Sequence, residues 1–265
     1  MKILFIGDIV GKLGRQAVAK AWSEIKKKHD PDLIIANAEN ATHGNALGIN
    51  AYHELKKIGI NFFTLGDHAF KTKENLELLN QSNPDVIRPA NYPPNVPGLG
   101  SQIIEVGSKK ILIINLIGRV FMKFDYDCPF RALSEILKSH EGEKLAAIIV
   151  DFHAEATSEK NALARYFDGS VSAIFGTHTH IPTCDDQILP KGTAFVSDAG
   201  MVGAKNSVIG VKIEPIIKMF LHQYKMPFEP AESGPAVFNS VLVEIDPKTR
   251  LAKKIIRLDK KVEVW

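Results

Sequence analysis

Short apolar runs alternate with longer amphipathic segments along the first third of the chain. The apolar runs end at glycine or polar residues, as buried strands do, whereas the longer segments repeat apolar residues at helical spacing. The predicted strands cover residues 2–8, 31–40 and 60–67, and the predicted helices cover residues 12–28, 50–58 and 73–81. Strands that alternate with helices in this way predict an α/β fold.

The rest of the chain continues the pattern after a proline-rich interruption. Residues 82–98 hold five prolines and are predicted to be mostly irregular. Later strands are predicted at 101–106, 110–118, 144–153, 171–180, 193–197, 236–246 and 251–259, and later helices at 131–139, 158–167 (capped by Ser158) and 214–224. The last two strands, joined by a PKTR turn, indicate a mixed sheet or a second sheet packed on the first. We expect a single domain over residues 1–265.

Composition narrows the class of protein without deciding its function. Of 265 residues, 45% are hydrophobic and 24% are charged, and the net charge is only +3, so no dense basic patch suggests stable DNA binding. The two cysteines, Cys128 and Cys184, are too few for a disulfide framework and form no CxxC pair. We see no signal peptide and no apolar run long enough for a membrane span, and therefore expect a cytoplasmic protein.

Five of the predicted strands end in side chains that can bind a metal ion. These are Asp8, Glu39 with Asn40, Asp67 with His68, His153, and His178 with His180. In open α/β sheets, ligands bind beyond the carboxyl ends of the strands, where loops from distant parts of the chain meet. The sequence therefore predicts that these residues form one site.

Each strand end also has a structural explanation when it is taken alone. The alternatives are a helix cap at Asp8, turns at Glu39–Asn40 and Asp67, a surface imidazole at His68, and a satisfied core imidazole at His153. The two imidazoles of His178 and His180 are harder to explain structurally, because this spacing lets both point toward one or two ions. Five unrelated coincidences at strand ends would be needed, so their joint occurrence favours a shared site.

The candidate ligands offer only nitrogen and oxygen atoms, which suit manganese, iron or zinc, whereas calcium avoids imidazoles. There are more ligands than one ion needs, so two ions that share a bridging carboxylate are expected. Two ions roughly 3.5–4 Å apart hold a hydroxide between them and clamp a phosphoryl group for in-line attack. A histidine beside the ligands, but not itself a ligand, suits protonation of the leaving oxygen.

The order of these motifs resembles that of the calcineurin-like metallophosphoesterases. It resembles most closely their YmdB-like branch, known as 2′,3′-cyclic-nucleotide 2′-phosphodiesterases. The resemblance rests on the stretches ILFIGDIVGKLGR, NAENATHGNALG, GDHAF, RPANYP, DFHAEATSEK and GTHTHIPTCDDQILPKGTAFVSDAGM, between residues 3 and 201. It implies an α/β fold that is a four-layer α/β/β/α sandwich with mixed sheets and a dinuclear metal site. It also implies hydrolysis of 2′,3′-cyclic nucleotides to 3′-nucleotides, iron as the metal with manganese as a substitute, and homo-oligomers.

The resemblance also implies a role for each site residue. One ion would be held by Asp8, Glu39, Asn40 and His180; Glu39 would bridge to a second ion, held also by Asp67, His153 and His178. His68 would be the general acid.

Two positions depart from the wider pattern. The superfamily usually has Asp-X-His at the first strand, but the sequence here is Asp8-Ile9-Val10, and Asn40 would fill the coordination gap as in the YmdB-like branch. Asp67 stands where asparagine is usual, and its negative charge should tighten the second metal and soften its Lewis acidity.

Other assignments stay open at the level of sequence. Arg88 and Asn91 are candidate substrate contacts, but a rigid proline loop with a salt-bridged arginine explains them equally well. The alternative functions are a phosphomonoesterase or phosphoprotein phosphatase with the same metals, and a regulatory protein that binds metal or nucleotide with little turnover. A substrate panel separates the first from a phosphodiesterase, and tight nucleotide binding without product formation would indicate the second.

Overall fold

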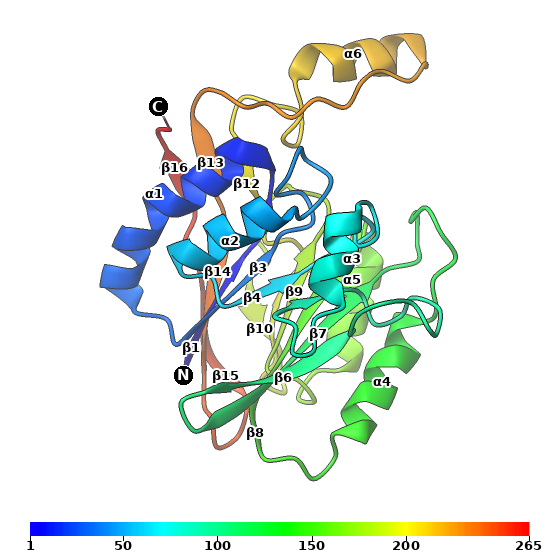
Figure 1. Ribbon diagram of the computed structural model, residues 1–265. Helices are drawn as coiled ribbons and strands as arrows, with labels where there is room; N and C mark the ends of the chain where they lie inside the picture. Colours follow the sequence, from blue (N-terminus) through cyan, green and yellow to red (C-terminus); the bar gives the residue numbers. More distant parts are fainter. Residues whose placement is uncertain (265) are drawn as a thin grey trace.

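The computed structural model describes residues 1–264, and within them the N-terminal strands build a six-stranded mixed sheet (Figure 1). Its strands, in spatial order, are β15 (Ala252–Arg257), β14 (Ser240–Ile245), β1 (Lys2–Ile6), β3 (Leu33–Asn37), β4 (Phe62–Thr64) and β5 (Val86–Ile87). Strands β1, β3, β4 and β5 run parallel, and the C-terminal pair adds antiparallel beside β1. The mixed sheet predicted from the terminal strand pair is therefore confirmed.

A second sheet, which also has six strands within the described residues, packs against the first. In spatial order it consists of β10 (Gln187–Ile188), β11 (Ala194–Val196), β9 (Ala173–Thr177), β8 (Leu145–His153), β7 (Lys109–Ile117) and β6 (Ser101–Val106). Its four inner strands are parallel and its two edge strands are antiparallel.

Alternating side chains of the strands divide the apolar core into layers. In β1, Ile3 and Phe5 face the second sheet, whereas Leu4 and Ile6 face the helices on the outside of the first sheet. Phe5 stacks on Phe175 of β9 across the sheet interface, with ring centroids 4.5 Å apart and planes within 10°. Because the central strands are covered on both faces, they consist of apolar residues almost throughout.

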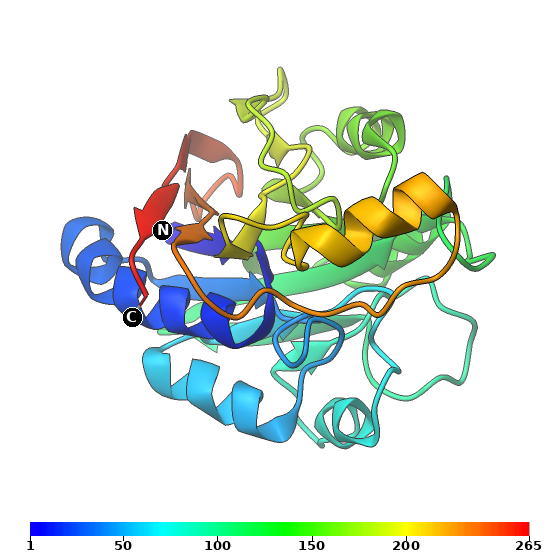
Figure 2. The same ribbon diagram turned by 90° about the horizontal axis from the view of Figure 1, so that it is seen from above.

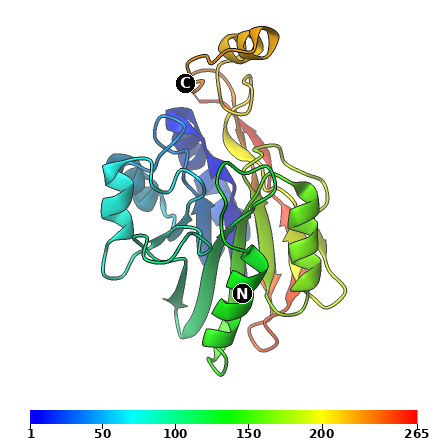
Figure 3. The same cartoon turned by 90° about the vertical axis from the view of Figure 1, so that its right-hand side faces the viewer.

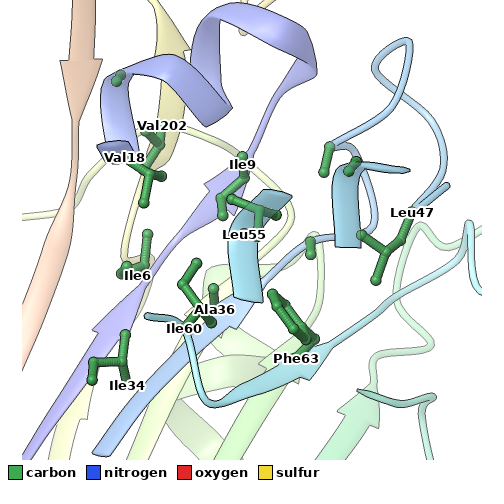
Figure 4. Close-up of a cluster of buried hydrophobic side chains, with 14 of the residues drawn as sticks. Ile6, Ile9, Val18, Ile34, Ala36, Leu47, Leu55, Ile60, Phe63 and Val202 are labelled. Carbon is green, nitrogen blue, oxygen red and sulfur yellow. The ribbon is translucent and has the colours of Figure 1, made fainter. Parts of the chain in front are cut away.

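Helices cover the outer face of each sheet. The first sheet is covered by α1 (Gly11–His29), α2 (Ile49–Ile58) and α3 (Lys73–Leu79), and the second by α4 (Pro129–Ser139) and α5 (Thr157–Tyr166). Figure 4 shows the first of these cores, where Val18 and Leu55 of the helices meet Ile6, Ile34 and Phe63 of the strands. Figure 3 shows both sheets between the two groups of helices, so the predicted α/β/β/α sandwich is confirmed.

A small third sheet joins both ends of the chain. It contains β16 (Lys260–Val262), β13 (Ala236–Phe238), β12 (Met201–Ala204) and β2 (Asp8–Ile9). The single strand predicted over 236–246 is therefore wrong, because it breaks at Asn239, whose amide donates to the carbonyl of Met201 and whose own carbonyl accepts from Gly7. From this end of the molecule, helix α6 (Ile213–His222) projects away from the sandwich (Figures 1 and 2).

Two local predictions about helix starts need correction. Helix α5 begins at Thr157 after Ala156, so Ser158 lies inside the helix and is not its cap. Helix α1 begins after Val10 and has no side-chain cap, so Asp8 is not a helix cap and is available for another role. Within residues 1–264, no helix is both long enough and apolar enough to cross a membrane.

Candidate metal centre

The eight predicted strand-end residues lie at one edge of the sandwich. Asp8 lies in β2 just after β1, and Glu39–Asn40 and Asp67–His68 lie in the turns that follow β3 and β4. The second sheet contributes His153, the last residue of β8, and His178 and His180, which follow β9. Each of the eight has a side-chain nitrogen or oxygen within 3.9 Å of another member, so the carboxyl ends of both sheets converge on a single cluster.

Four of these residues form a compact candidate metal site. Ligand atoms of Glu39, Asp67, His153 and His178 all lie within 4.8 Å of one another. The Nε2 atom of His153 is 3.2 Å from Oε1 of Glu39, 3.3 Å from Oδ1 of Asp67 and 3.0 Å from Nδ1 of His178. Two carboxylates and two imidazoles that face a common point fit a divalent ion such as iron, manganese or zinc.

The neighbouring group contains Asp8, Asn40 and His180. Nε2 of His180 is 3.7 Å from Oδ1 of Asp8 and 3.2 Å from Nδ2 of Asn40. Asp8 is fully buried, and its Oδ1 has no hydrogen-bond partner among residues 1–264. A buried carboxylate oxygen without a partner is costly, and a cation beside His180 would satisfy it. The amide of Asn40 would have to rotate to turn its oxygen toward such an ion, because Oδ1 faces His68.

His68 lies beside these groups. Its backbone nitrogen donates to Oε2 of Glu39 at 3.0 Å, and its Nδ1 is 2.8 Å from Oδ1 of Asn40. The other ring nitrogen, Nε2, is 3.9 Å from Oδ2 of Asp67, and the side chain is 28% exposed. The ring is therefore fixed at one nitrogen while it stays accessible to solvent.

The charges in the cluster are strongly coupled. Burial opposes protonation of His153, but Glu39 and Asp67 outweigh it and raise the pKa of His153 well above its usual value. Burial and then the charge of His153 lower the pKa of His178 to about 4. Despite burial, His153 and the other imidazoles hold the pKa values of Glu39 and Asp67 below their usual range. The imidazoles therefore favour the ionised forms of Glu39 and Asp67, whereas burial raises the pKa of Asp8, whose charge needs a further cation.

The buried Asp151 orients the ring of His153 through a hydroxyl group. Thr177 donates to Oδ1 of Asp151 at 2.7 Å and accepts from Nδ1 of His153 at 3.0 Å, while Thr64 and Asn37 donate to Oδ2 of Asp151. Burial raises the pKa of Asp151 to about 6. This chain keeps a proton on Nδ1 of His153 and directs Nε2 toward the cluster, a support that metal-binding imidazoles commonly have.

The loop that carries His178 and His180 is held by a buried ion pair. Both histidines have positive φ angles, 96° and 66°, which non-glycine residues rarely adopt without support. Between them, the backbone nitrogen and hydroxyl of Thr179 donate to Oδ2 of Asp198, which also binds Nζ of Lys160 at 2.8 Å. Nδ1 of His180 donates to the carbonyl of Ile209 at 2.8 Å, so Nε2 carries the lone pair, which faces Nδ2 of Asn40 and could bind a cation instead.

Sequence reasoning missed the residues that support the ligands. Asp151 carried a usable signal, a charged residue inside an otherwise apolar strand, but Lys160 looked like any surface lysine of an amphipathic helix. Glu155 was also missed; its Oε2 lies 3.2 Å from Nε2 of His178.

The structure gives the two predicted substrate contacts full sets of internal hydrogen bonds. Asn91 is buried, donates to the carbonyls of Ile117 and Asp127, and accepts from the nitrogen of Ile117. Arg88 donates to carbonyls of the proline-rich loop, including those of Pro89 and Pro97. These contacts match the structural alternative, a rigid loop, although no carboxylate pairs with the arginine among residues 1–264.

Comparison with known proteins identifies the family. Residues 4–258 match the model of the family described as "YmdB-like protein". The chain belongs to the YmdB-like family. A Bacillus subtilis relative named 2′,3′-cyclic-nucleotide 2′-phosphodiesterase is 41% identical, and the alignment covers 97% of this chain and 96% of that protein. This YmdB-like protein is accordingly a phosphoesterase, as the sequence resemblance predicted.

Solved structures agree with the family assignment and the fold. A phosphatase from Mycoplasma pneumoniae superposes with a TM-score of 0.92 at 38% identity, covering 99% of this chain and 94% of that one. A 5′-nucleotidase precursor from Thermus thermophilus superposes with a TM-score of 0.59 at 13% identity, covering 98% of this chain and 54% of that one. The second likeness shows that the metallophosphoesterase fold is shared.

Proposed function

We propose that this YmdB-like protein is a dinuclear metal phosphodiesterase that converts 2′,3′-cyclic nucleotides to 3′-nucleotides. The observation that carries the proposal is the single cluster of oxygen and nitrogen ligands that includes the unpartnered, buried Oδ1 of Asp8. Glu39, Asp67, His153 and His178 would hold one ion. Asp8, Asn40 and His180, with Glu39 as the bridge, would hold the other.

Two bound ions would supply Lewis acidity, which lowers the pKa of water and neutralises charge on a phosphoryl group. We propose iron, with manganese as a substitute, because the resemblance to the YmdB-like branch implies these metals and the nitrogen and oxygen ligands suit both. The residues of the chain would position the phosphate so that water attacks phosphorus and the bond to the 2′ oxygen breaks. The product keeps the phosphate on the 3′ oxygen.

His68 is proposed to protonate the departing 2′ oxygen. Its Nδ1 is fixed by Asn40, its Nε2 is not bound by another side chain within 3.5 Å among the described residues, and it lies outside the four-residue metal site. A proton on Nε2 can therefore pass to the leaving oxygen without removing a metal ligand.

Leaving-group dependence tests this role. His68→Ala should lower kcat for 2′,3′-cyclic AMP by about 10²–10⁴-fold with unchanged metal content, as expected when a general acid is lost. The loss should be much smaller for bis-p-nitrophenyl phosphate, because its leaving phenolate needs no proton. His53→Ala, on the exposed face of α2, is the matched control. Loss of metal in His68→Ala, or equal losses on both substrates, would contradict the assignment.

A phosphomonoesterase that uses the same residues is the second candidate, since the structurally similar M. pneumoniae protein is described as a phosphatase. Purified protein loaded with iron or manganese should be assayed on 2′,3′-cyclic AMP and 3′-AMP together. Turnover of the cyclic diester that stops at 3′-AMP supports a diesterase. Release of phosphate from 3′-AMP supports a monoesterase.

We further propose that the protein forms a homo-oligomer through helix α6. Ile213, Ile217, Phe220 and Leu221 form an apolar stripe that is 44–74% exposed, whereas only Ile216 of this helix is buried. A helix this short is not stable by itself in water, so a second copy packed on the stripe would supply missing contacts. Sedimentation should show a lower mass for Phe220→Asp than for Phe121→Asp, an exposed site elsewhere. The cytoplasmic location stays a prediction from sequence.

A further inference from the structure

A row of four aromatic rings runs from the His68 turn to an exposed loop. Phe70, two residues after His68, contacts Tyr92 edge to face with centroids 5.1 Å apart. Tyr92 contacts Tyr126 at 4.8 Å, and Tyr126 contacts Phe124 at 6.2 Å. The row therefore begins two residues after the proposed general acid and ends at Phe124, which is 56% exposed.

The loop of residues 118–127 that carries the outer rings is firmly anchored to the metal centre. Its first nitrogen, that of Gly118, donates to the carbonyl of His153. The side chain of Asn91 bonds both ends of the loop through Ile117 and Asp127, and the carboxylate of Glu159 accepts from the nitrogens of Arg119 and Val120. The side chain of Asn91 therefore holds this loop and has no free hydrogen-bonding group of its own to offer.

The phenol groups of the row lie within the electrostatic reach of the ligands. Burial raises the pKa of Tyr92, and Tyr126, Asp67 and Glu39 raise it further. Burial also raises the pKa of Tyr126, and the charges of Asp67 and Glu39 raise it further. At the outer end, Nζ of Lys123 lies over one face of the Phe124 ring, 5.1 Å from its centroid. Aromatic side chains with a nearby cation are what protein surfaces use to bind nucleobases by stacking.

We propose that this aromatic row is the nucleobase side of the substrate site, with Phe124 as the stacking residue. The inference rests on the proposed function for the placement of the phosphate at the metal centre. It adds that the base extends along the 118–127 loop, so that recognition comes from ring stacking and tolerates different bases.

Equilibrium binding tests the inference separately from catalysis. Adenosine 3′-monophosphate and inorganic phosphate are titrated calorimetrically into manganese-loaded wild type, Phe124→Ala and Phe121→Ala. Phe121 is the control, because it belongs to the same loop and is 86% exposed, but has no aromatic ring contact among residues 1–264. Both variants should fold normally, since neither phenylalanine is buried.

Wild type should bind the nucleotide more tightly than phosphate. Phe124→Ala should weaken nucleotide binding by about fivefold or more, as expected for a lost stacking contact, and leave phosphate binding unchanged. Phe121→Ala should change neither. Equal binding of both ligands by wild type, or equal effects of the two variants, would overturn the inference. Turnover of 2′,3′-cyclic AMP is measured on the same samples: its absence, with the binding pattern intact, would refute only the proposed function.

Discussion

The two sheets contribute different kinds of ligand to one centre. Beside the first sheet, Asp8 of the short strand β2, which follows β1, and the turns after β3 and β4 supply carboxylates and an amide, whereas the second sheet supplies three imidazoles. Each imidazole has a contact outside the cluster: His153 with Thr177, His178 with Glu155, and His180 with the carbonyl of Ile209. The oxygen ligands of the first sheet face mainly the cluster itself, and Oδ1 of Asp8 faces no donor among residues 1–264.

We call Asp8 and the ligands after β3 and β4 the first half of the centre, and the imidazoles of the second sheet its second half. The difference between them suggests how each half reaches its binding geometry. The second sheet orients its nitrogen atoms before any ion binds, so its contribution depends on the surrounding hydrogen bonds. The first sheet brings buried negative charge, so its contribution depends on cations that compensate it. Substitutions that displace a ligand or remove a supporting hydrogen bond should therefore weaken metal binding mainly through the second half. Substitutions that remove a charged ligand should weaken it through the first half.

The largest effect is expected at Gly66, where the two halves meet. A Cβ atom at this position would lie 2.3 Å from the ring of His153 and 2.5 Å from Oε2 of Glu39, so one of these ligands must move. A displacement of about 1 Å in a catalytic site can cost 10²-fold in rate, and Gly66→Ala should lose at least that much activity together with bound metal. Metal content and turnover provide the measurement.

Gly142→Ala is the control for this substitution. A Cβ atom there meets nothing within 4 Å, but the positive φ of 88° makes the change unfavourable for the backbone. It should lower stability while metal content and activity persist. Normal metal binding by Gly66→Ala would show that the two halves do not form one centre.

The next effect is expected at Lys160, which supports the second half. Both Lys160 and Asp198 are 1% exposed, so Lys160→Met leaves a buried carboxylate without its cation. Loss of one partner from a buried pair costs about 3–5 kcal/mol of unfolding free energy. The Thr179 loop should also lose its anchor, so metal affinity should fall as well.

Chemical denaturation and metal titration of Lys160→Met check both consequences. Lys110→Met is the matched control, because its pair with Glu143 is exposed by 45% and 43% and should contribute at most about 1 kcal/mol. If both variants lost the same stability, the buried pair would not be what holds the histidine loop.

The contrast between the halves also explains what could be predicted from the sequence. The α/β alternation follows from apolar runs and helical spacing, and the candidate ligands follow from polar residues at strand ends, because both patterns are local, whereas the four-layer arrangement was expected from the family resemblance. The break at Asn239 was missed because the residues on both sides of it suit a strand, and only pairing with distant partners assigns them to different sheets.

The supporting residues could not be found for a related reason. Lys160 and Asp198 are 38 residues apart, and Asn91 binds Asp127 across 36 residues. Hydrogen bonds of this kind depend on tertiary packing, and the local spacing of residues in the sequence does not predict them. The sequence therefore located the candidate ligands but not what holds them.

The smallest effect is expected at Asp67, where the family resemblance led us to expect asparagine. Asp67→Asn keeps an oxygen within reach of His153 and His178 but removes one negative charge from the first half. Weaker electrostatic attraction should lower metal affinity by about tenfold. Turnover with saturating metal should be maintained or rise, because a less neutralised ion is the stronger Lewis acid. Chelator sensitivity and kcat are measured in parallel with Asp30→Asn, a surface change outside the site. If Asp67→Asn resists the chelator as well as wild type does, the negative charge of Asp67 does not contribute to ion binding, and the electrostatic contrast between the two halves rests on Asp8 and Glu39 alone.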